Sequence, residues 1–307
     1  MPTAKQNFLQ RIFTIEKSLL TPNVLDGLPT ENEHNDIARL LRNGIAVVGF
    51  VALEDFIKNR AIEILNEVAS SHIPFTSLTE DLQYYSTVDV LKSILRIANF
   101  ENNKIDRIAL VQNETKIISS SLNTSYDLNK HTFGYNNSNI SKDEIKRILK
   151  AFKIQDSWNK QTALASILGI TSLPLDNSFD NAASRRHRAA HDISSIIPIL
   201  DLTQFINEAI AIALTFDAFL SYAKNKLIND NTNFLASSAT VDYTHLSLSF
   251  IKKETNKWKY KRHGRTNAVK INSDKNILMT EVIPISRSHN ECLIIYDEVN
   301  KVTNWYT

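Results

Sequence analysis

The stretch ARLLRNGIAVVGFVALEDFIKN, residues 38–59, lies within the strongest helical pattern of the sequence, which runs from about residue 35 to residue 70. Its apolar residues recur every three or four positions, as on one face of an α-helix: Ile37, Leu41, Ile45, Val48, Ala52 and Phe56, widened by Leu40, Val47 and Val51. So wide an apolar face must be covered by other helices, which predicts a central bundle helix. Gly44 and Gly49 inside it indicate close helix packing or a bend.

A second long helix is expected at residues 201–227, where apolar residues again recur at helical spacing, and it should pair with the central one. Shorter helices are expected at residues 7–20, 86–99, 141–152 and 157–168. Residues 113–141 are rich in Asn, Ser and Thr and are predicted to be mostly loop. Two long helices with shorter ones between them predict an antiparallel helical bundle.

The character of the sequence changes at the polar segment NDNTN, residues 229–233, after which the apolar period shortens toward two. Strands are expected at residues 245–251, 257–263, 277–285, 291–297 and 302–306. The predicted fold is therefore mainly α, with a helical domain over residues 1–228 and a small C-terminal β domain over residues 229–307.

Composition narrows the class of protein. The chain has 307 residues, of which 43% are hydrophobic, so it can bury a sizeable core. Its net charge of +2 is too small to mark the whole protein as a nucleic-acid binder. The longest apolar run, residues 45–53, is about half of what crosses a bilayer, and no secretory leader is recognisable, so we expect a cytoplasmic protein without a membrane segment. One cysteine, Cys292, excludes a disulfide framework and is expected to be a buried apolar residue.

The densest cluster of chemically active side chains is SRRHRAAHD, residues 184–192. Three arginines, Arg185, Arg186 and Arg188, are permanent cations suited to binding phosphate oxygens. His187 and His191 titrate near neutral pH and can transfer protons. The alternative is a solvated basic turn of a helix with no chemical role.

Arg186 and His191, separated by four residues of which the first is polar, resemble the Arg-His motif of the HEPN superfamily. In that superfamily the motif lies near the end of a helix and is followed by a long closing helix, as residues 201–227 would supply. Residues 38–59 are similar to the long early helix of the ribonuclease-type, RiboL-PSP-like members, where an acidic residue follows a small-apolar run as Glu54 does here. The resemblance covers roughly residues 30–228.

The resemblance implies a metal-independent endoribonuclease that acts as a homodimer, with no cofactor. Cutting RNA without a metal requires a base for the ribose 2′-hydroxyl and a fixed cation beside the phosphoryl oxygens. His191 would be the base and Arg186 the phosphate-binding cation. The products would be a 2′,3′-cyclic phosphate and a 5′-hydroxyl, and DNA, which lacks the 2′-hydroxyl, would not be cut.

Helix geometry bears on this site. Five positions along an α-helix correspond to about 500°, which leaves Arg186 and His191 about 140° apart around the axis. A two-fold axis beside the motif would bring in a second copy of each group, which is the physical reason to expect a dimer.

His187 and His191 share a helix face at the spacing of a two-histidine metal site, but Arg188 stands where a zinc protease has its glutamate, and the nearby arginines oppose a cation. We therefore predict no metal site. Asp192 either orients an imidazole or faces water. Glu54 either pairs with Arg185 or Arg186 or lies at the surface.

The C-terminal segment contains a basic run that includes four candidate RNA-binding residues: Lys257, Lys259, Lys261 and Arg262. In a strand the three lysines would share one face, and Trp258 and Tyr260 the other, so cations and aromatic rings would not form one stacking surface. Lysines that protect an edge strand are an equally good explanation.

These observations lead to one main functional expectation and two alternatives. The main one is an endoribonuclease with RNA as substrate, acting as a toxin or antiphage defence effector. The first alternative is a non-catalytic module that binds RNA or nucleotide. The second is an interaction protein regulated by a partner such as an antitoxin.

Overall fold

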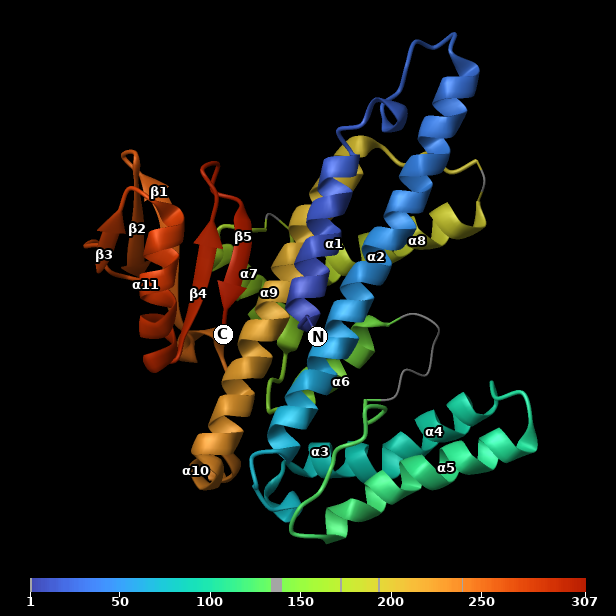
Figure 1. Ribbon diagram of the computed structural model, residues 1–307, viewed down its shortest axis with the longest axis vertical. Helices are drawn as coiled ribbons and strands as arrows, with labels where there is room; N and C mark the ends of the chain where they lie inside the picture. Colours follow the sequence, from blue (N-terminus) through green and yellow to red (C-terminus); the bar gives the residue numbers. More distant parts are fainter. Residues whose placement is uncertain (1, 134–139, 172, 193, 239) are drawn as a thin grey trace. The chain divides into compact units, whose positions relative to one another are not determined.

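The structure is a computed structural model that describes residues 2–133, 140–171, 173–192, 194–238 and 240–307 (Figure 1). As predicted, the chain is mainly helical and ends in a small sheet. The helices are α1 Ala4–Ser18, α2 Asn32–Ala69, α3 Glu80–Tyr84, α4 Val90–Ala98, α5 Lys104–Ser119, α6 Lys142–Ala151, α7 Ser157–Leu168, α8 Leu175–His191, α9 Ile199–Asn229, α10 Asn231–Ala236 and α11 Lys275–Ser288. The strands are β1 Ser247–Glu254, β2 Lys257–Arg262, β3 Lys270–Asn272, β4 Glu291–Tyr296 and β5 Val302–Tyr306.

The chain divides into two compact units, each assembled from separate segments. The first unit comprises Met1–Phe56, Trp158–Ala218 and Asp242–Thr307, and so holds α8 and the sheet. The second comprises Ile57–Ser157 and Phe219–Val241. The proposed boundary between a helical domain of residues 1–228 and a β-rich domain of residues 229–307 stays a prediction.

In the first unit, α2 and α9 pack closely, as their patterns predict. A Cβ atom at Gly49 would lie 2.7 Å from Cε1 of the Phe205 ring, so glycine permits the contact between these helices. Phe56 and Phe216 meet farther along, with ring centroids 6.4 Å apart. Close packing is thus the explanation for Gly49, whereas a Cβ at Gly44 would meet open space.

Of the described helices, α9 alone is long and apolar enough to cross a membrane by length and composition. Its most apolar window is 67% buried inside the protein, as in a helix that forms a core. The buried residues of α9 include Ala209, Ala213 and Phe216, which are at most 1% exposed.

In the second unit, the helix expected over residues 86–99 is a longer succession: α3, a π-helical turn Tyr85–Asp89, and α4. The loop expected over residues 113–141 is wrong at its start, because residues 113–119 belong to α5. That helix is capped by the Asn103 side chain, which accepts from the backbone N–H of Asp106, and buries only Glu114 among its residues, so it carries no apolar period. Residues 134–139 of that expectation lie outside the described ones.

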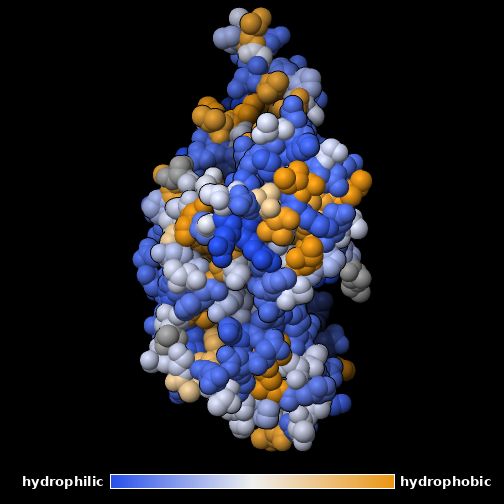
Figure 2. Space-filling view, turned by 90° about the vertical axis from the view of Figure 1, so that its left-hand side faces the viewer, coloured by the Kyte–Doolittle hydropathy of each residue, from blue (hydrophilic) through white to orange (hydrophobic). Residues whose placement is uncertain are grey.

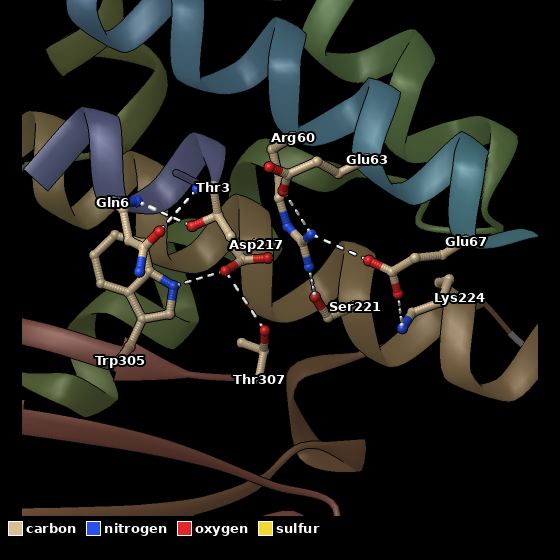
Figure 3. Close-up of polar contacts among 10 residues, drawn as sticks. All are labelled: Thr3, Gln6, Arg60, Glu63, Glu67, Asp217, Ser221, Lys224, Trp305 and Thr307. Carbon is tan, nitrogen blue, oxygen red and sulfur yellow. Dashed lines mark hydrogen bonds and ion pairs between the residues drawn. The ribbon is translucent and has the colours of Figure 1, made fainter. Parts of the chain in front are cut away.

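The same unit contains an ionic network between α2 and α9 (Figure 3). Arg60 donates to Glu63 at 3.0 Å and to the Ser221 hydroxyl at 2.8 Å. Glu67 accepts from Arg60 and from Lys224, which continues the network by one helical turn. Charged side chains therefore join the two long helices where their facing residues are no longer all apolar.

The sheet belongs to the first unit and has the strand order β3-β2-β1-β4-β5. β1 and β4 are parallel, and all other neighbouring strands are antiparallel. Four of the expected strands are confirmed, and β3 is an additional short one.

The strand expected at residues 277–285 is wrong, because this segment lies in helix α11. The Asp274 side chain caps that helix by accepting from the backbone N–H groups of Asn276 and Ile277. Leu278, Val282 and Ser286 are its buried residues and recur every four positions. Isoleucines and a valine suit a strand as well, which is why composition alone misled the prediction.

The two faces of the sheet are covered differently. On one face, α11 packs on a core that contains Ile251, Tyr260 and Leu293. On the other face Trp305 of β5 is fully buried, with its ring centroid 6.3 Å from that of Phe56 in α2. The Trp305 indole N–H donates to the carboxylate of Asp217 in α9 at 2.7 Å (Figure 3), so this residue joins the sheet to the helices of its unit.

Cys292 of β4 is buried, as expected, and burial raises the pKa of its thiol to about 12.

Replacing Trp305 by phenylalanine should lower the free energy of unfolding by about 1–3 kcal/mol or more, because Asp217, a 2% exposed residue, loses the indole N–H as a donor. Urea unfolding followed by circular dichroism measures this change. Trp258→Phe is the matched control, since it shrinks a buried ring in the sheet core without removing a donor from a carboxylate. Equal destabilisation of the two variants would contradict a specific contribution from the hydrogen bond.

Candidate functional site

Helix α8 is held in the first unit by one buried face. Its buried residues recur at helical spacing: Leu175, Ser178, Phe179, Ala182 and Arg185. The Phe179 ring lies 5.5 Å from that of Phe50 in α2 and 5.7 Å from that of Trp158 in α7. The first half of α8 is therefore anchored by apolar packing, and its last turns carry the Arg-His motif.

Arg186 and His191 leave α8 on different sides, as the helix geometry predicts. Arg186 is half-buried, and its Nε is a buried atom without a hydrogen-bond partner. No ion pair or hydrogen bond joins the Arg186 guanidinium to any described residue. His191, the last residue of the helix, is exposed, and its ring centroid lies 4.8 Å from that of the exposed His187. Both members of the motif remain available to a ligand.

Arg185 has a different environment from its neighbours. Its Nη2 lies 3.5 Å from Oε2 of Glu208 in α9, and only 11% and 8% of the two side chains are exposed. These two atoms form no hydrogen bond, although the other carboxylate oxygen of Glu208 accepts from Gln204 at 2.8 Å. The ion pair connects the motif helix to the long closing helix.

Sequence reasoning missed Glu208. The signal for it is a lone carboxylate between Phe205 and Ile212, within the apolar stripe of the closing helix. Such a residue is buried only with a partner, and the arginine-rich segment before the closing helix is one source of such a partner. Glu208 also lines a pocket of about 450 Å³ formed by residues 169–171, by α9 and by the turn between β4 and β5.

Glu54 lies in α2 and is buried, at 4% exposure, so it is not a surface carboxylate. The ion pair of Arg185 is formed with Glu208 and not with Glu54.

Asp192 follows the last residue of the motif helix and is its C-cap. Its carboxylate accepts from the backbone N–H of Ser194 at 2.9 Å and from the hydroxyl of the same residue at 2.6 Å. These two hydrogen bonds lower the pKa of Asp192 below its ordinary value, and the bond from the hydroxyl has the larger effect. Arg188 makes a smaller contribution. The carboxylate thus shapes the turn after the helix and does not contact an imidazole. The carbonyl oxygen of Ser195, the next residue, accepts a hydrogen bond from Asn43 of α2 at 3.1 Å.

Within the described ranges, no group of three or more His, Cys, Asp or Glu side chains is arranged to hold a metal ion.

The four candidate RNA-binding residues of the C-terminal segment lie on β2. Lys259 and Lys261 both contact Glu254 of β1, at 3.1 and 2.7 Å, and Arg262 pairs with Glu291 of β4. Lys257 is exposed at the start of the strand. Trp258 and Tyr260 enter the core on the other face, as the alternation of β2 predicts. None of these four residues forms a hydrogen bond or an ion pair with the described residues of the α8 motif.

A model of the family described as RiboL-PSP-HEPN matches residues 11–222, which is more than half of the chain and includes the whole of α8. No curated protein and no solved structure matches the chain. The matched region contains the long early helix, the Arg-His motif and most of the closing helix on which the resemblance rested. The chain therefore belongs to the RiboL-PSP-HEPN family of the HEPN superfamily.

Proposed function

We propose that the protein is a metal-independent endoribonuclease whose site contains Arg186 and His191. Membership of the family supports a role connected with RNA. The observation that carries the catalytic proposal is the state of the motif. A half-buried guanidinium without an internal ion pair and an exposed imidazole stand one and a half turns apart on one anchored helix. An arginine that served only the fold would be expected to pair with a carboxylate, as Arg185 does with Glu208.

The proposed reaction uses the two side chains as follows. His191 takes the proton of the ribose 2′-hydroxyl, whose oxygen attacks the adjacent phosphorus. Arg186 donates hydrogen bonds to the phosphoryl oxygens, where negative charge grows in the transition state. The P–O5′ bond breaks, which leaves a 2′,3′-cyclic phosphate on one fragment and a 5′-hydroxyl on the other. His187 and Arg188 extend the same exposed side of the helix and are proposed to contact neighbouring phosphates.

A homodimer is part of this proposal, because Arg186 and His191 point to different sides of α8. An exposed apolar stripe on α2 offers a surface for a second copy: Ile37, Leu40, Leu41 and Val48. These residues, with Gly44 between them, fall within about 100° around the helix axis. Asn43, in the middle of this segment, donates a hydrogen bond to the carbonyl oxygen of Ser195. Ile196 and Leu200, which follow Ser195 in the chain, are also exposed. The stripe therefore lies beside the chain that follows the motif.

The biological role is proposed on the basis of family membership alone. We propose a cytoplasmic toxin or antiphage defence effector, restrained by an antitoxin or another regulatory protein. A non-catalytic module that binds RNA or nucleotide is the competing outcome of the first experiment below.

Wild-type protein should cut single-stranded RNA in the presence of EDTA, whereas His191→Ala and Arg186→Ala should each cut about 100-fold more slowly or worse. Gel electrophoresis with end-group analysis measures the rate and identifies the cyclic phosphate. His289→Ala, which removes an exposed imidazole at the end of α11, is the control and should retain full activity. Binding of RNA without cleavage by the wild type would favour the non-catalytic module, and loss of activity in EDTA would contradict the metal-independent mechanism.

Leu40→Glu, at a position 71% exposed, should convert the dimer into a monomer and abolish cleavage, because a carboxylate would be buried at the two-fold contact. Sedimentation velocity gives the oligomeric state. Ile277→Glu, at an exposed position of α11, is the matched control and should leave the dimer intact. A wild-type protein that is monomeric at the concentrations where it cuts RNA would refute the shared site.

Glu208→Gln should lower the free energy of unfolding by roughly 3–5 kcal/mol, since it leaves the buried charge of Arg185 without a counter-ion. Denaturant unfolding measures the change, and a double-mutant cycle with Arg185→Gln isolates the coupling between the two residues. The double variant should be more stable than the sum of the two single effects predicts. Additive effects would mean that the pair contributes nothing beyond the separate environments of its members.

A further inference from the structure

On the face of the sheet opposite α11, most of the part formed by β1 and β2 is less buried than the part formed by β4. Phe250 and Lys252 of β1 point to the same side as Cys292, Ile294 and Tyr296 of β4, because β1 and β4 are paired in register. The β4 residues on this side are buried, whereas Phe250 and Lys252 are only half-buried. Lys261 lies directly opposite Phe250, and Lys259 directly opposite Lys252, so β2 continues the same open surface.

This surface contains a pocket of about 170 Å³ at the turn after β2. Five of its lining residues carry a permanent positive charge or an ammonium group, and one carries a carboxylate: Lys252, Lys259, Lys261, Arg262 and Arg265 against Glu254. Phe250, His263 and Gly264 complete the lining. Figure 2, which views the side of the molecule where the strands and α11 are drawn in Figure 1, shows a group of strongly hydrophilic residues in the middle of that side.

The carboxylates of the described residues do not neutralise this pocket. Glu254 accepts from both Lys259 and Lys261, and no hydrogen bond joins it to Lys252. Lys252 forms no ion pair with a described carboxylate, and its Nζ lies 3.9 Å from the centroid of the Tyr296 ring. Its counterpart across the strands is the like-charged Lys259, an arrangement that costs stability unless an anion lies between them. Burial lowers the pKa of Lys252 despite the opposing attraction of Glu254, as expected of an ammonium group short of counter-charge.

Aromatic rings adjoin the cations on the same surface. The Phe250 ring is half-buried, and its centroid lies 6.0 Å from that of the exposed His263 ring. Along β2 alone, side-chain alternation places the lysines on one face and the aromatic residues on the other, where they enter the core. The neighbouring strand β1 supplies an aromatic ring on the lysine side, which alternation within a single strand does not show.

We propose that this pocket binds the phosphate groups of a single-stranded RNA, with Lys252 and Arg265 as the cations that contact the phosphates and Phe250 and His263 as the rings against which a base stacks. Cations beside aromatic rings on an open sheet surface are the combination that binds single-stranded nucleic acid. An acidic peptide would be matched by the charge but would make no use of the rings. The inference rests on the proposed function in taking RNA as the ligand, and it assigns to the sheet a binding site separate from the α8 motif.

The test is equilibrium binding of a fluorescent, 2′-O-methylated oligonucleotide to the full-length protein, measured by anisotropy at several salt concentrations. The methylated strand lacks the nucleophile, so binding is measured without cleavage. Lys252→Gln and Arg265→Gln should each weaken binding several-fold and reduce the slope of log affinity against log salt by about 0.7 for each phosphate that the variant no longer neutralises. Lys252→Arg should retain the slope.

Lys275→Gln is the matched control. Lys275 is also a partly buried lysine over an aromatic ring, 4.8 Å from the Trp258 centroid, but it lies on α11 at the opposite face of the sheet. Its replacement should leave affinity and slope unchanged. Circular dichroism of each variant checks that the sheet is folded.

The proposal is overturned if Lys252→Gln and Arg265→Gln bind the strand with wild-type affinity and slope. It is also overturned if the pocket binds AMP or inorganic phosphate but not the oligonucleotide, which would indicate a site for a free nucleotide or ion. Failure of this site is distinguishable from failure of the nuclease. His191→Ala should bind the methylated strand with wild-type affinity. If the pocket variants also bind normally while His191→Ala no longer cuts unmodified RNA, the pocket proposal fails and the nuclease proposal stands.

Discussion

The close approach of α2 and α9 at Gly49 is the constraint on which the first unit depends. With no side chain at this position, the Phe205 ring can lie against the backbone of α2, and the two long helices meet along apolar faces. The same pair of helices presents the partners of the motif helix: Phe50 of α2 packs on Phe179, and Glu208 of α9 pairs with Arg185. The position of α8, and with it that of Arg186 and His191, is therefore determined by the packing of two helices that do not carry the motif.

Adjacent arginines of the motif have different environments. Arg185 is used by the fold, because its charge is matched by a buried carboxylate. Arg186, one position on, has no such partner among the described residues. A rotation of about 100° between neighbours on a helix is enough to produce this difference, so a run of similar cations does not imply a common environment.

The sequence predicted most of the helical architecture because a long amphipathic pattern indicates a helix whichever elements pack against it. It failed where local composition was ambiguous. Ile277, Val282 and Ile283 suit a strand, and only the capping Asp274 and the four-residue spacing of Leu278, Val282 and Ser286 reveal α11. α5 was missed because it buries a single residue, Glu114, and so lacks an apolar stripe. In the site, the motif residues were recognisable, but the pairing of Glu208 with Arg185 was not, since a lone carboxylate within an apolar stripe indicates burial without identifying its partner. Phe250 and Lys252 became candidates only through strand pairing.

The burial of Cys292 has a practical consequence. Since the single thiol of the chain is buried in β4 and its pKa is raised to about 12, maleimide reagents should not react with it in the folded protein. A cysteine introduced on the surface would then be the sole point of attachment for a spin label or a dye. Distances between two such labels, one on each copy of the proposed dimer, could be measured without first removing the natural cysteine and disturbing the strand that contains it.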